Sequence, residues 1–169
     1  VEGGSSRDFA ITREWAWKYS KQVDALLGSL IESTISFLSL QASAGADALM
    51  LFDSWASAVP AAQRNWLVTQ PARLIIEELR KNGHKQPVIG FPKGIGEGLI
   101  TYVDQSGVDA VGLDHGVDPV WVDRNLPQNF PIQGNLDPLS LLQAGPEMFK
   151  DIDHILDAFA NRPHIFNLG

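Results

Sequence analysis

The sequence contains no cysteine among its 169 residues. Disulfide bonds, thiolate nucleophiles and cysteine-ligated zinc are therefore excluded within it, and a reducing cytoplasmic setting is permitted. Basic residues are also few: 13 Lys and Arg stand against 20 Asp and Glu, and the formal net charge is -7. A nucleic-acid backbone is bound by clustered Lys and Arg, which are scattered here, so we expect no nucleic-acid partner.

Long hydrophobic runs are missing as well. No uninterrupted apolar run approaches the roughly 18 to 20 residues of a membrane-spanning helix, and the first residues, VEGGSSRDF, lack the basic and apolar regions of a signal peptide. The sequence therefore predicts no membrane partner, and we expect a cytoplasmic protein. With 44% hydrophobic and 20% charged residues, the composition is that of a folded globular domain.

Helical and strand-like segments alternate along the chain. Apolar residues recur at helical spacing from Lys21 to Gln41, and a second helical region extends from Pro60 to Asn82, with Pro71 expected to split it in two. A further helix is expected from Pro146 to Phe159. Short apolar runs typical of strands buried on both faces lie at 48–53, 87–92, 107–114, 130–134 and 164–167.

Two of the expected strands echo each other, GADALMLFD at 45–53 and GVDAVGLD at 107–114. In both, a glycine that ends a helix leads into a strand that finishes on aspartate, as in tandem βα units. This pattern predicts a parallel α/β sheet, either doubly wound or closed into a (β/α)8 TIM barrel. A barrel needs eight strands and typically about 250 residues, so length alone favours the open sheet. Both ends look cut, which favours an incomplete barrel of about five strands, with residues 1–169 forming a single domain.

Polar residues follow the carboxyl end of every expected strand. They are Asp53 and Ser54, Lys93, Asp114 and His115, Gln133 with Asn135 and Asp137, and Asn167. In both α/β architectures ligands bind beyond the carboxyl ends of the strands, so these residues would share one mouth. Each could equally terminate a strand or cap a helix, and Asp137 ahead of Pro138 is better explained as a cap.

Other motifs carry less chemistry. The turn GIGEG after Lys93 lacks the spacing of a nucleotide-binding loop, and we interpret it as a tight strand-to-helix turn. No histidine has a second ligand at metal spacing, so no metal is expected, and only His115 is considered for a site. Ser54 lacks the G-x-S-x-G of a hydrolase nucleophile. The aromatic stretch from Trp15 to Tyr19 is interpreted as core or interface filling.

Six strings occur in an order and spacing that resembles the uroporphyrinogen decarboxylase family: VEGGSSRDF, ALMLFDSWA, VIGFPKGIGEGL, VDAVGLDHGVD, PIQGNLDP and HIFNLG. The resemblance covers essentially the whole chain. It implies a single-domain (β/α)8 barrel, usually a homodimer, of which this chain supplies the later half. It also implies decarboxylation of the four acetate side chains of uroporphyrinogen, a tetrapyrrole, to give coproporphyrinogen in heme biosynthesis, with no metal or organic cofactor.

The resemblance also bears on individual residues. Ser54 in FDSWA matches the family's substrate-contacting hydroxyl. Residues in matching motifs that are candidates for the cleft or its scaffold are Asp53, Lys93, Asp114, Gln133 and Asn135. His115 stands where many members carry an aromatic residue. The family's catalytic acid, arginine, tyrosine and histidine would lie outside residues 1–169, so we expect the chain to be inactive alone.

Two alternatives stay open. One is a zinc-dependent corrinoid or thiol methyltransferase of the same superfamily, although thiolate ligation is impossible in a stretch without cysteine. The other is a non-catalytic half-barrel that folds only by pairing with its absent half or with a copy of itself. The unpaired edges of an open parallel sheet would favour such association.

Overall fold

The computed structural model describes residues 1–169, whose centre is one parallel sheet. Its strands are β1 (Leu49–Asp53), β2 (Val88–Pro92), β3 (Ala110–Gly112), β4 (Ile132–Gln133) and β5 (His164–Ile165). They lie in the order β1-β2-β3-β4-β5, each parallel to its neighbours. A doubly wound sheet reverses its strand order, and no reversal occurs here. The sheet is open within residues 1–169, as length alone favours, but it is not doubly wound.

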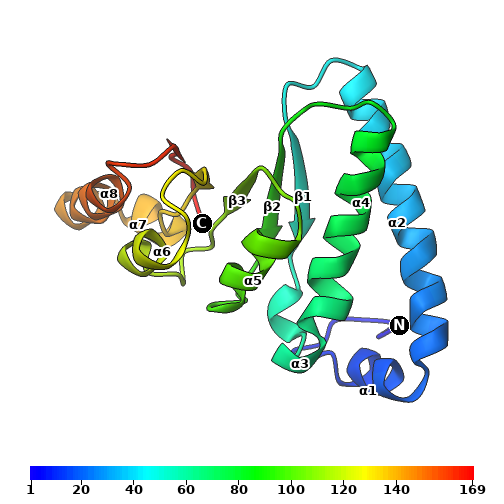
Figure 1. Cartoon of the computed structure of the whole chain (residues 1–169). Coiled ribbons are helices and arrows are strands. Elements are labelled where there is room, and N and C mark those ends of the chain that lie inside the picture. The colour runs from blue at the N-terminus through cyan, green and yellow to red at the C-terminus, as the bar shows by residue number, and fades with distance from the viewer.

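Helices connect the strands. They are α1 (Ala10–Lys18), α2 (Ser20–Ser43), α3 (Ala61–Arg64), α4 (Gln70–Lys81), α5 (Gly98–Gln105), α6 (Pro119–Asn125), α7 (Pro138–Gln143) and α8 (Pro146–Ala158), with a 3-10 turn η1 (Ala56–Ala58) and a π turn η2 (Asn65–Thr69). In Figure 1, α2 and α4 stand beside β1 and β2, while α6, α7 and α8 gather at the other end of the sheet.

Two helices begin with the same aspartate-proline cap. Asp118 accepts a hydrogen bond from the N–H of Val120 at 2.9 Å, and Asp137 accepts one from the N–H of Leu139 at 2.9 Å. A proline follows each aspartate in the first turn, where its missing N–H has no helical partner to lose. The interpretation of Asp137 as a cap is confirmed, and the same signal marks α6.

Pro71 changes the helix type without breaking the helix. The backbone from Arg64 to Gln70 stays in the right-handed helical region at the junctions of α3, η2 and α4. Within η2 the N–H of Gln70 donates to the carbonyl of Asn65, which is the wider π spacing. A proline ring clashes with the carbonyl four residues earlier, and a π turn just before Pro71 relieves that crowding. The expected division is present only as this local change.

One face of the sheet packs under the helices. Side chains alternate between the two faces along each strand. Leu49, Val88, Val111 and Ile132 point to the same face and are almost completely buried within a core of 22 residues. Right-handed crossovers between sequential parallel strands place the helices on this one face, which accounts for its burial.

The opposite face of the sheet is not covered by helices. We call it the open face, and its residues are Met50, Phe52, Ile89, Phe91, Gln133 and Ile165. None of them belongs to the buried core. Phe52 is 62% exposed and Ile165 is 51% exposed, while the other four are half-buried, so this face is only partly covered.

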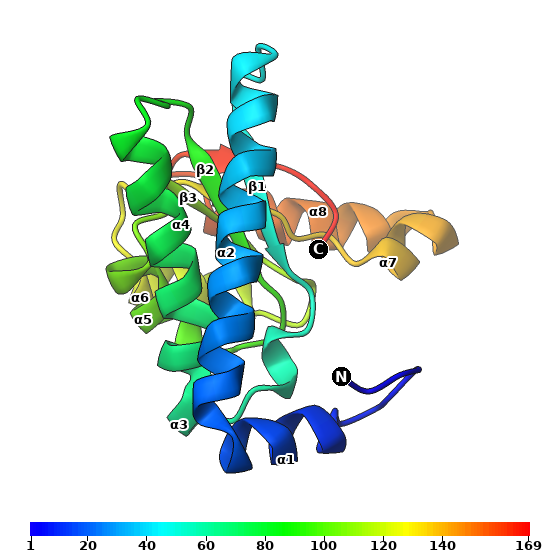
Figure 2. The ribbon, with the colours of Figure 1, turned by 90° about the vertical axis from the view of Figure 1, so that its right-hand side faces the viewer.

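The long helix α2 bears on the expectation about apolar length. An 18-residue window of α2 has a mean hydropathy of 1.4, which is enough, by length and composition, to cross a membrane. The uninterrupted apolar runs in α2 are short, as expected, because Asp24, Glu32 and several serines interrupt them, but the average hydropathy of the window stays high. α2 lies along β1 and α4 (Figure 2), and Leu38 and Ala42 are buried in the core. Only 11% of the window is buried, and a single helix of this kind is weak evidence for a membrane span.

The aromatic stretch from Trp15 to Tyr19 does not fill the core. Most of it lies on α1, where only Ala16 is buried, and the side chains of Trp17 and Tyr19 are exposed. α1 sits at the lower end of α2, below the sheet (Figure 2). The core interpretation is therefore wrong for Trp17 and Tyr19, because α1 lies beyond the end of the sheet.

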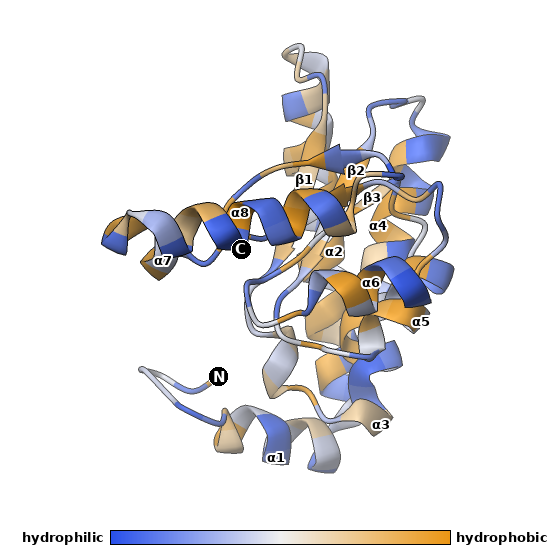
Figure 3. Ribbon diagram, turned by 90° about the vertical axis from the view of Figure 1, so that its left-hand side faces the viewer, coloured by the Kyte–Doolittle hydropathy of each residue, from blue (hydrophilic) through white to orange (hydrophobic).

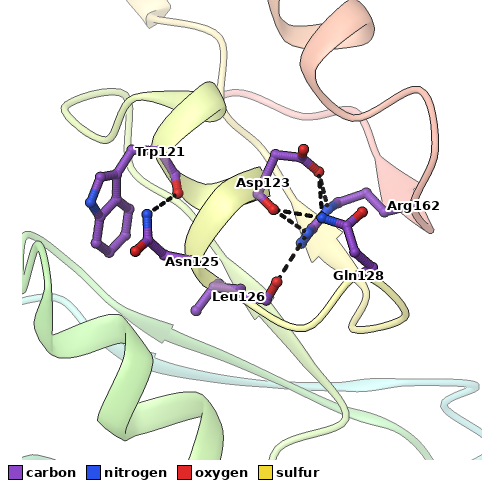
Figure 4. Close-up of polar contacts among 6 residues, drawn as sticks. All are labelled: Trp121, Asp123, Asn125, Leu126, Gln128 and Arg162. Carbon is purple, nitrogen blue, oxygen red and sulfur yellow. Dashed lines mark hydrogen bonds and ion pairs between the residues drawn. The ribbon is translucent and has the colours of Figure 1, made fainter.

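A buried cation, Arg162, fixes the carboxyl end of α6 (Figure 4). Its Nε donates to the Asp123 carboxylate at 3.1 Å, and its Nη2 donates to the backbone oxygens of Asp123 at 3.2 Å and Leu126 at 3.3 Å. The Arg162 side chain has no exposed surface. The last carbonyls of a helix lack intrahelical hydrogen-bond donors. Arg162, in the connection between α8 and β5, donates to two such carbonyls at the end of α6.

Candidate functional site

Hydrogen bonds join the carboxyl ends of β1, β2 and β3. The N–H of Lys93 donates to the carbonyl of Asp53 at 3.1 Å, and the N–H of Ser57 donates to the carbonyl of Lys93 at 3.0 Å. One residue later, the N–H of Gly94 donates to the Asp114 carboxylate at 2.8 Å. The N–H of Gly94 is therefore bonded within the chain and is not free to bind a phosphate group. This fits the interpretation of the glycine-rich segment as a tight turn.

Asp114 and Asn135 connect β3 to β4. The Asn135 amide nitrogen donates to the carbonyls of Asp114 at 3.0 Å and Val117 at 2.8 Å. The second oxygen of the Asp114 carboxylate accepts the N–H of Gly116 at 3.0 Å. Asn135 is buried. Both side chains therefore use polar groups to hold loops in place.

Gly169 brings the end of β5 against β3 and β4. Its N–H donates to the carbonyl of Leu136 at 2.8 Å. A Cβ at this position would lie 2.8 Å from the carbonyl carbon of Asp114 and would also overlap the backbone of His115. Only glycine allows such a close approach of two backbones.

Ser54 and Lys93 lie beside each other at the mouth. They directly follow the last paired residues of β1 and β2. Strand alternation, carried one residue past the end of each strand, puts Ser54 on the side of Phe52 and Lys93 on the side of Phe91. Both residues are exposed, and neither side chain makes a hydrogen bond or ion pair within the chain. The structure thus brings the backbones of these two predicted site residues together just beyond β1 and β2.

Aromatic rings form the floor below them. The rings of Phe52 and Phe91 meet edge to face, with centroids 5.8 Å apart. The Phe91 ring also lies over Gly112, where a Cβ would be 2.8 Å from the Phe91 Cδ2. Gln133 faces the same side, and its Nε2 lies 4.0 Å from the sulfur of Met50. The open face is thus apolar, with polar groups along the carboxyl ends of its strands.

Asp53 lies on the covered face, unlike its neighbour Ser54. Burial raises the pKa of Asp53, and a hydrogen bond from the backbone of Trp55 opposes that shift. Close to it is Tyr102 on α5, whose pKa is raised by burial and, to a smaller extent, by the charge of Asp53. Sequence reasoning missed Tyr102. The one signal for it is Gly90, where a Cβ would lie 2.5 Å from the Tyr102 hydroxyl oxygen.

His115 lines a separate hollow of about 210 Å3 together with Asn135 and His154. His154 is exposed on α8, and its Nε2 lies 4.0 Å from the Asp118 carboxylate. No group of three or more His, Cys, Asp or Glu side chains among residues 1–169 is arranged to hold a metal ion. The hollow does not include Ser54 or Lys93.

These features define a parallel α/β domain, a class of protein in which ligands bind beyond the carboxyl ends of the strands. A family model described as uroporphyrinogen decarboxylase (URO-D) matches residues 1–169, and the chain belongs to this family. Over its whole length the chain is 47% identical to the uroporphyrinogen decarboxylase of Novosphingobium aromaticivorans, 42% to that of Maricaulis maris and 39% to that of Rhodospirillum rubrum. It spans about half the length of these relatives, 50%, 49% and 49% respectively.

Proposed function

We propose that this chain is part of a carboxy-lyase that removes the four acetate carboxyl groups of uroporphyrinogen as CO2 and leaves coproporphyrinogen. The observation that carries the proposal, beside family membership, is the open face. Ser54 and Lys93 are both exposed and directly follow the two strands that carry the Phe52 and Phe91 ring pair. An apolar floor with a few polar groups at its edge suits a macrocycle whose periphery carries carboxylates.

The proposed reaction needs no organic cofactor to accept electrons. A pyrrole ring protonated on carbon can itself accept the electron pair that CO2 leaves behind, the role that an organic cofactor plays in other decarboxylases. The protein then has to orient the macrocycle, pair its carboxylates and transfer a proton. We assign part of the first two tasks to this chain.

Each residue of the mouth has a separate role in the proposal. Ser54 contacts the substrate, since a hydroxyl can donate to a carboxylate. Gln133 belongs to the wall of the cleft. Asp114 and Asn135, whose polar groups hold neighbouring loops, act as scaffold. Asp53, on the covered face, is a buried carboxyl behind Ser54.

The sheet is proposed to be an arc of a (β/α)8 barrel, with residues 1–169 in a single domain that forms the later half. The sequential strand order, the helices on one face and the free apolar face all support closure. In such a barrel the open face lines the interior, and the outer edges of β1 and β5 pair with further strands.

A cytoplasmic homodimer is proposed as the working form. The hairpin of α7 and α8 projects from the sheet and alternates hydrophobic with hydrophilic residues (Figure 3). Leu139, Leu142 and Phe149 on this hairpin are exposed, and exposed apolar clusters favour a protein partner. The net charge of -7 supports neither a nucleic-acid nor an anionic membrane surface as partner.

The test joins this chain to the half of the Novosphingobium relative that it does not match, and follows porphyrinogen products by chromatography after oxidation. We expect stepwise loss of carboxyl groups down to coproporphyrinogen by the joined protein and none by the isolated chain. Ser54→Ala should lower kcat/KM by about tenfold, as expected for loss of a hydrogen bond to a charged group. Ser43→Ala, at an exposed serine at the end of α2, is the matched control. A folded joined protein that leaves uroporphyrinogen intact would overturn the proposal.

A further inference from the structure

Lys93 is held by its backbone while its side chain stays free. Its N–H donates to the carbonyl of Asp53 at the end of β1, and its carbonyl accepts the N–H of Ser57 in η1. The next amide, of Gly94, is bonded to Asp114. Lys93 is exposed and forms no ion pair within residues 1–169. The backbone of Lys93 is therefore fixed, and its ammonium group is available to a ligand.

The acidic residues around Lys93 are engaged elsewhere. Both carboxylate oxygens of Asp114 accept backbone amides, those of Gly94 and Gly116. Glu97 in the same turn approaches Arg64 at 3.5 Å. Asp53 points to the covered face, where it accepts a hydrogen bond from Trp55. Lys93 is thus the only permanent cation among the strand-end residues, and no carboxylate of the chain neutralises it.

Ser54 stands one strand away. The ladder of β1 and β2 ends at the pair of Asp53 and Pro92, and the N–H of Lys93 donates to the carbonyl of Asp53 at 3.1 Å, so the backbones of Ser54 and Lys93 lie next to each other just beyond the two strands. A hydroxyl donor and an ammonium on neighbouring segments can bind the two oxygens of one carboxylate. The Phe52 and Phe91 rings below them provide contact for the carbon skeleton that bears this carboxylate.

We infer that Lys93, together with Ser54, binds a side-chain carboxylate of the substrate and makes the mouth specific for a carboxylated ring system. The inference rests on the proposed function for the identity of the ligand, but not for the carboxylate site itself. Lys93 binds and orients the ligand and takes no part in proton transfer.

A first experiment uses the chain itself and a probe that is not a tetrapyrrole. Lysines are acetylated with and without mellitate, a benzene ring with six carboxylates, at constant ionic strength, and each site is quantified by mass spectrometry. Lys85 is the matched control, because it is exposed, free of ion pairs and located before the opposite end of β2. Mellitate should slow acetylation of Lys93 by about fivefold, in line with a partly exposed ion pair, and leave Lys85 unchanged. Equal protection of both lysines would overturn the carboxylate site.

A second experiment measures uroporphyrin binding to the chain by fluorescence. Lys93→Met should raise the Kd by about fivefold to tenfold, Lys93→Arg should stay within about twofold, and Lys85→Met should bind as the wild type does. Unchanged urea midpoints would show that the variants are folded. A Kd unaffected by Lys93→Met would overturn the role of Lys93 even if uroporphyrinogen is decarboxylated. Protection by mellitate without decarboxylation by the joined protein would instead keep the site and reject the proposed reaction.

Discussion

The N–H of Gly94 and the carboxylate of Asp114 meet at 2.8 Å across 20 residues of chain. This bond ties the turn after β2 to the end of β3, and the other oxygen of Asp114 holds Gly116 at 3.0 Å. Bonds from backbone amides to a carboxylate are stronger than those between neutral groups. One side chain therefore sets the positions of two turns at the mouth.

Removal of the Asp114 carboxylate should loosen both turns. We expect Asp114→Ala to lower the free energy of unfolding by about 1 to 2 kcal/mol, because two amides lose their acceptors but can reach water. Asp114→Asn keeps one acceptor and should cost less. Urea denaturation measures the change, with Asp104→Ala at an exposed position of α5 as control. A loss equal to that of the control would contradict the role assigned to Asp114.

The buried Arg162 should be among the costliest residues to replace. Arg162→Met removes the partner of Asp123 and of two carbonyls at the end of α6 (Figure 4), and we expect a loss of about 3 kcal/mol. Arg124→Met, at an exposed arginine next to Asp123 in sequence, should change stability by less than about 0.5 kcal/mol. The same urea experiment compares them. Similar small losses for the two variants would show that the buried bonds contribute little.

Two glycines should respond oppositely to alanine. A Cβ at Gly90 would lie 2.8 Å from the Val108 Cγ1 and closer still to Tyr102, so Gly90→Ala should cost about 1 to 3 kcal/mol through overpacking. Gly28 lies within α2 and has nothing within 4 Å of an added Cβ, so Gly28→Ala should stabilise by about 0.5 to 1 kcal/mol. Thermal and urea unfolding would reveal the signs. Stabilisation by Gly90→Ala would mean that Tyr102 does not pack there.

The ionisation of Asp53 should make stability depend on pH. Burial raises its pKa in the folded state, so the folded chain binds this proton more tightly than the unfolded chain does. Stability is therefore lost as the pH rises from the ordinary value of an aspartate through the raised value. Asp53→Asn cannot ionise, and its stability relative to the wild type should increase from about pH 3.5 to about pH 7. A constant difference between the two proteins over this range would contradict the burial of Asp53.

The strands and most helices were predictable because their signals are local. Apolar runs and glycine stops mark β1 and β2 closely, and the aspartate-proline cap marks α7. β3 and β4 are shorter than the expected runs at 107–114 and 130–134, since their outer residues belong to loops. α1 was missed because its aromatic residues are not arranged on one face toward a core.

The arrangement of the mouth was predictable only in part. That Ser54 and Lys93 share one edge follows from the rule for parallel strands. That Asp53 and Ser54 face opposite sides does not, because a strand that reads as a continuous apolar run shows no alternation from which to tell its faces. Tyr102 and Arg162 reach their partners from distant segments, and no local pattern reports such pairings.

Sequential strand order also governs how the molecule opens. Each strand pairs only with its neighbours in the chain, and no ladder joins β1 to β5. β1 and β2 share five residue pairs, whereas β4 and β5 share two. Amide exchange should therefore be fastest at β5 and slowest at β1 and β2, with stability graded along the chain as in a repeat array. We therefore expect β5 to open and close locally while β1 and β2 remain folded.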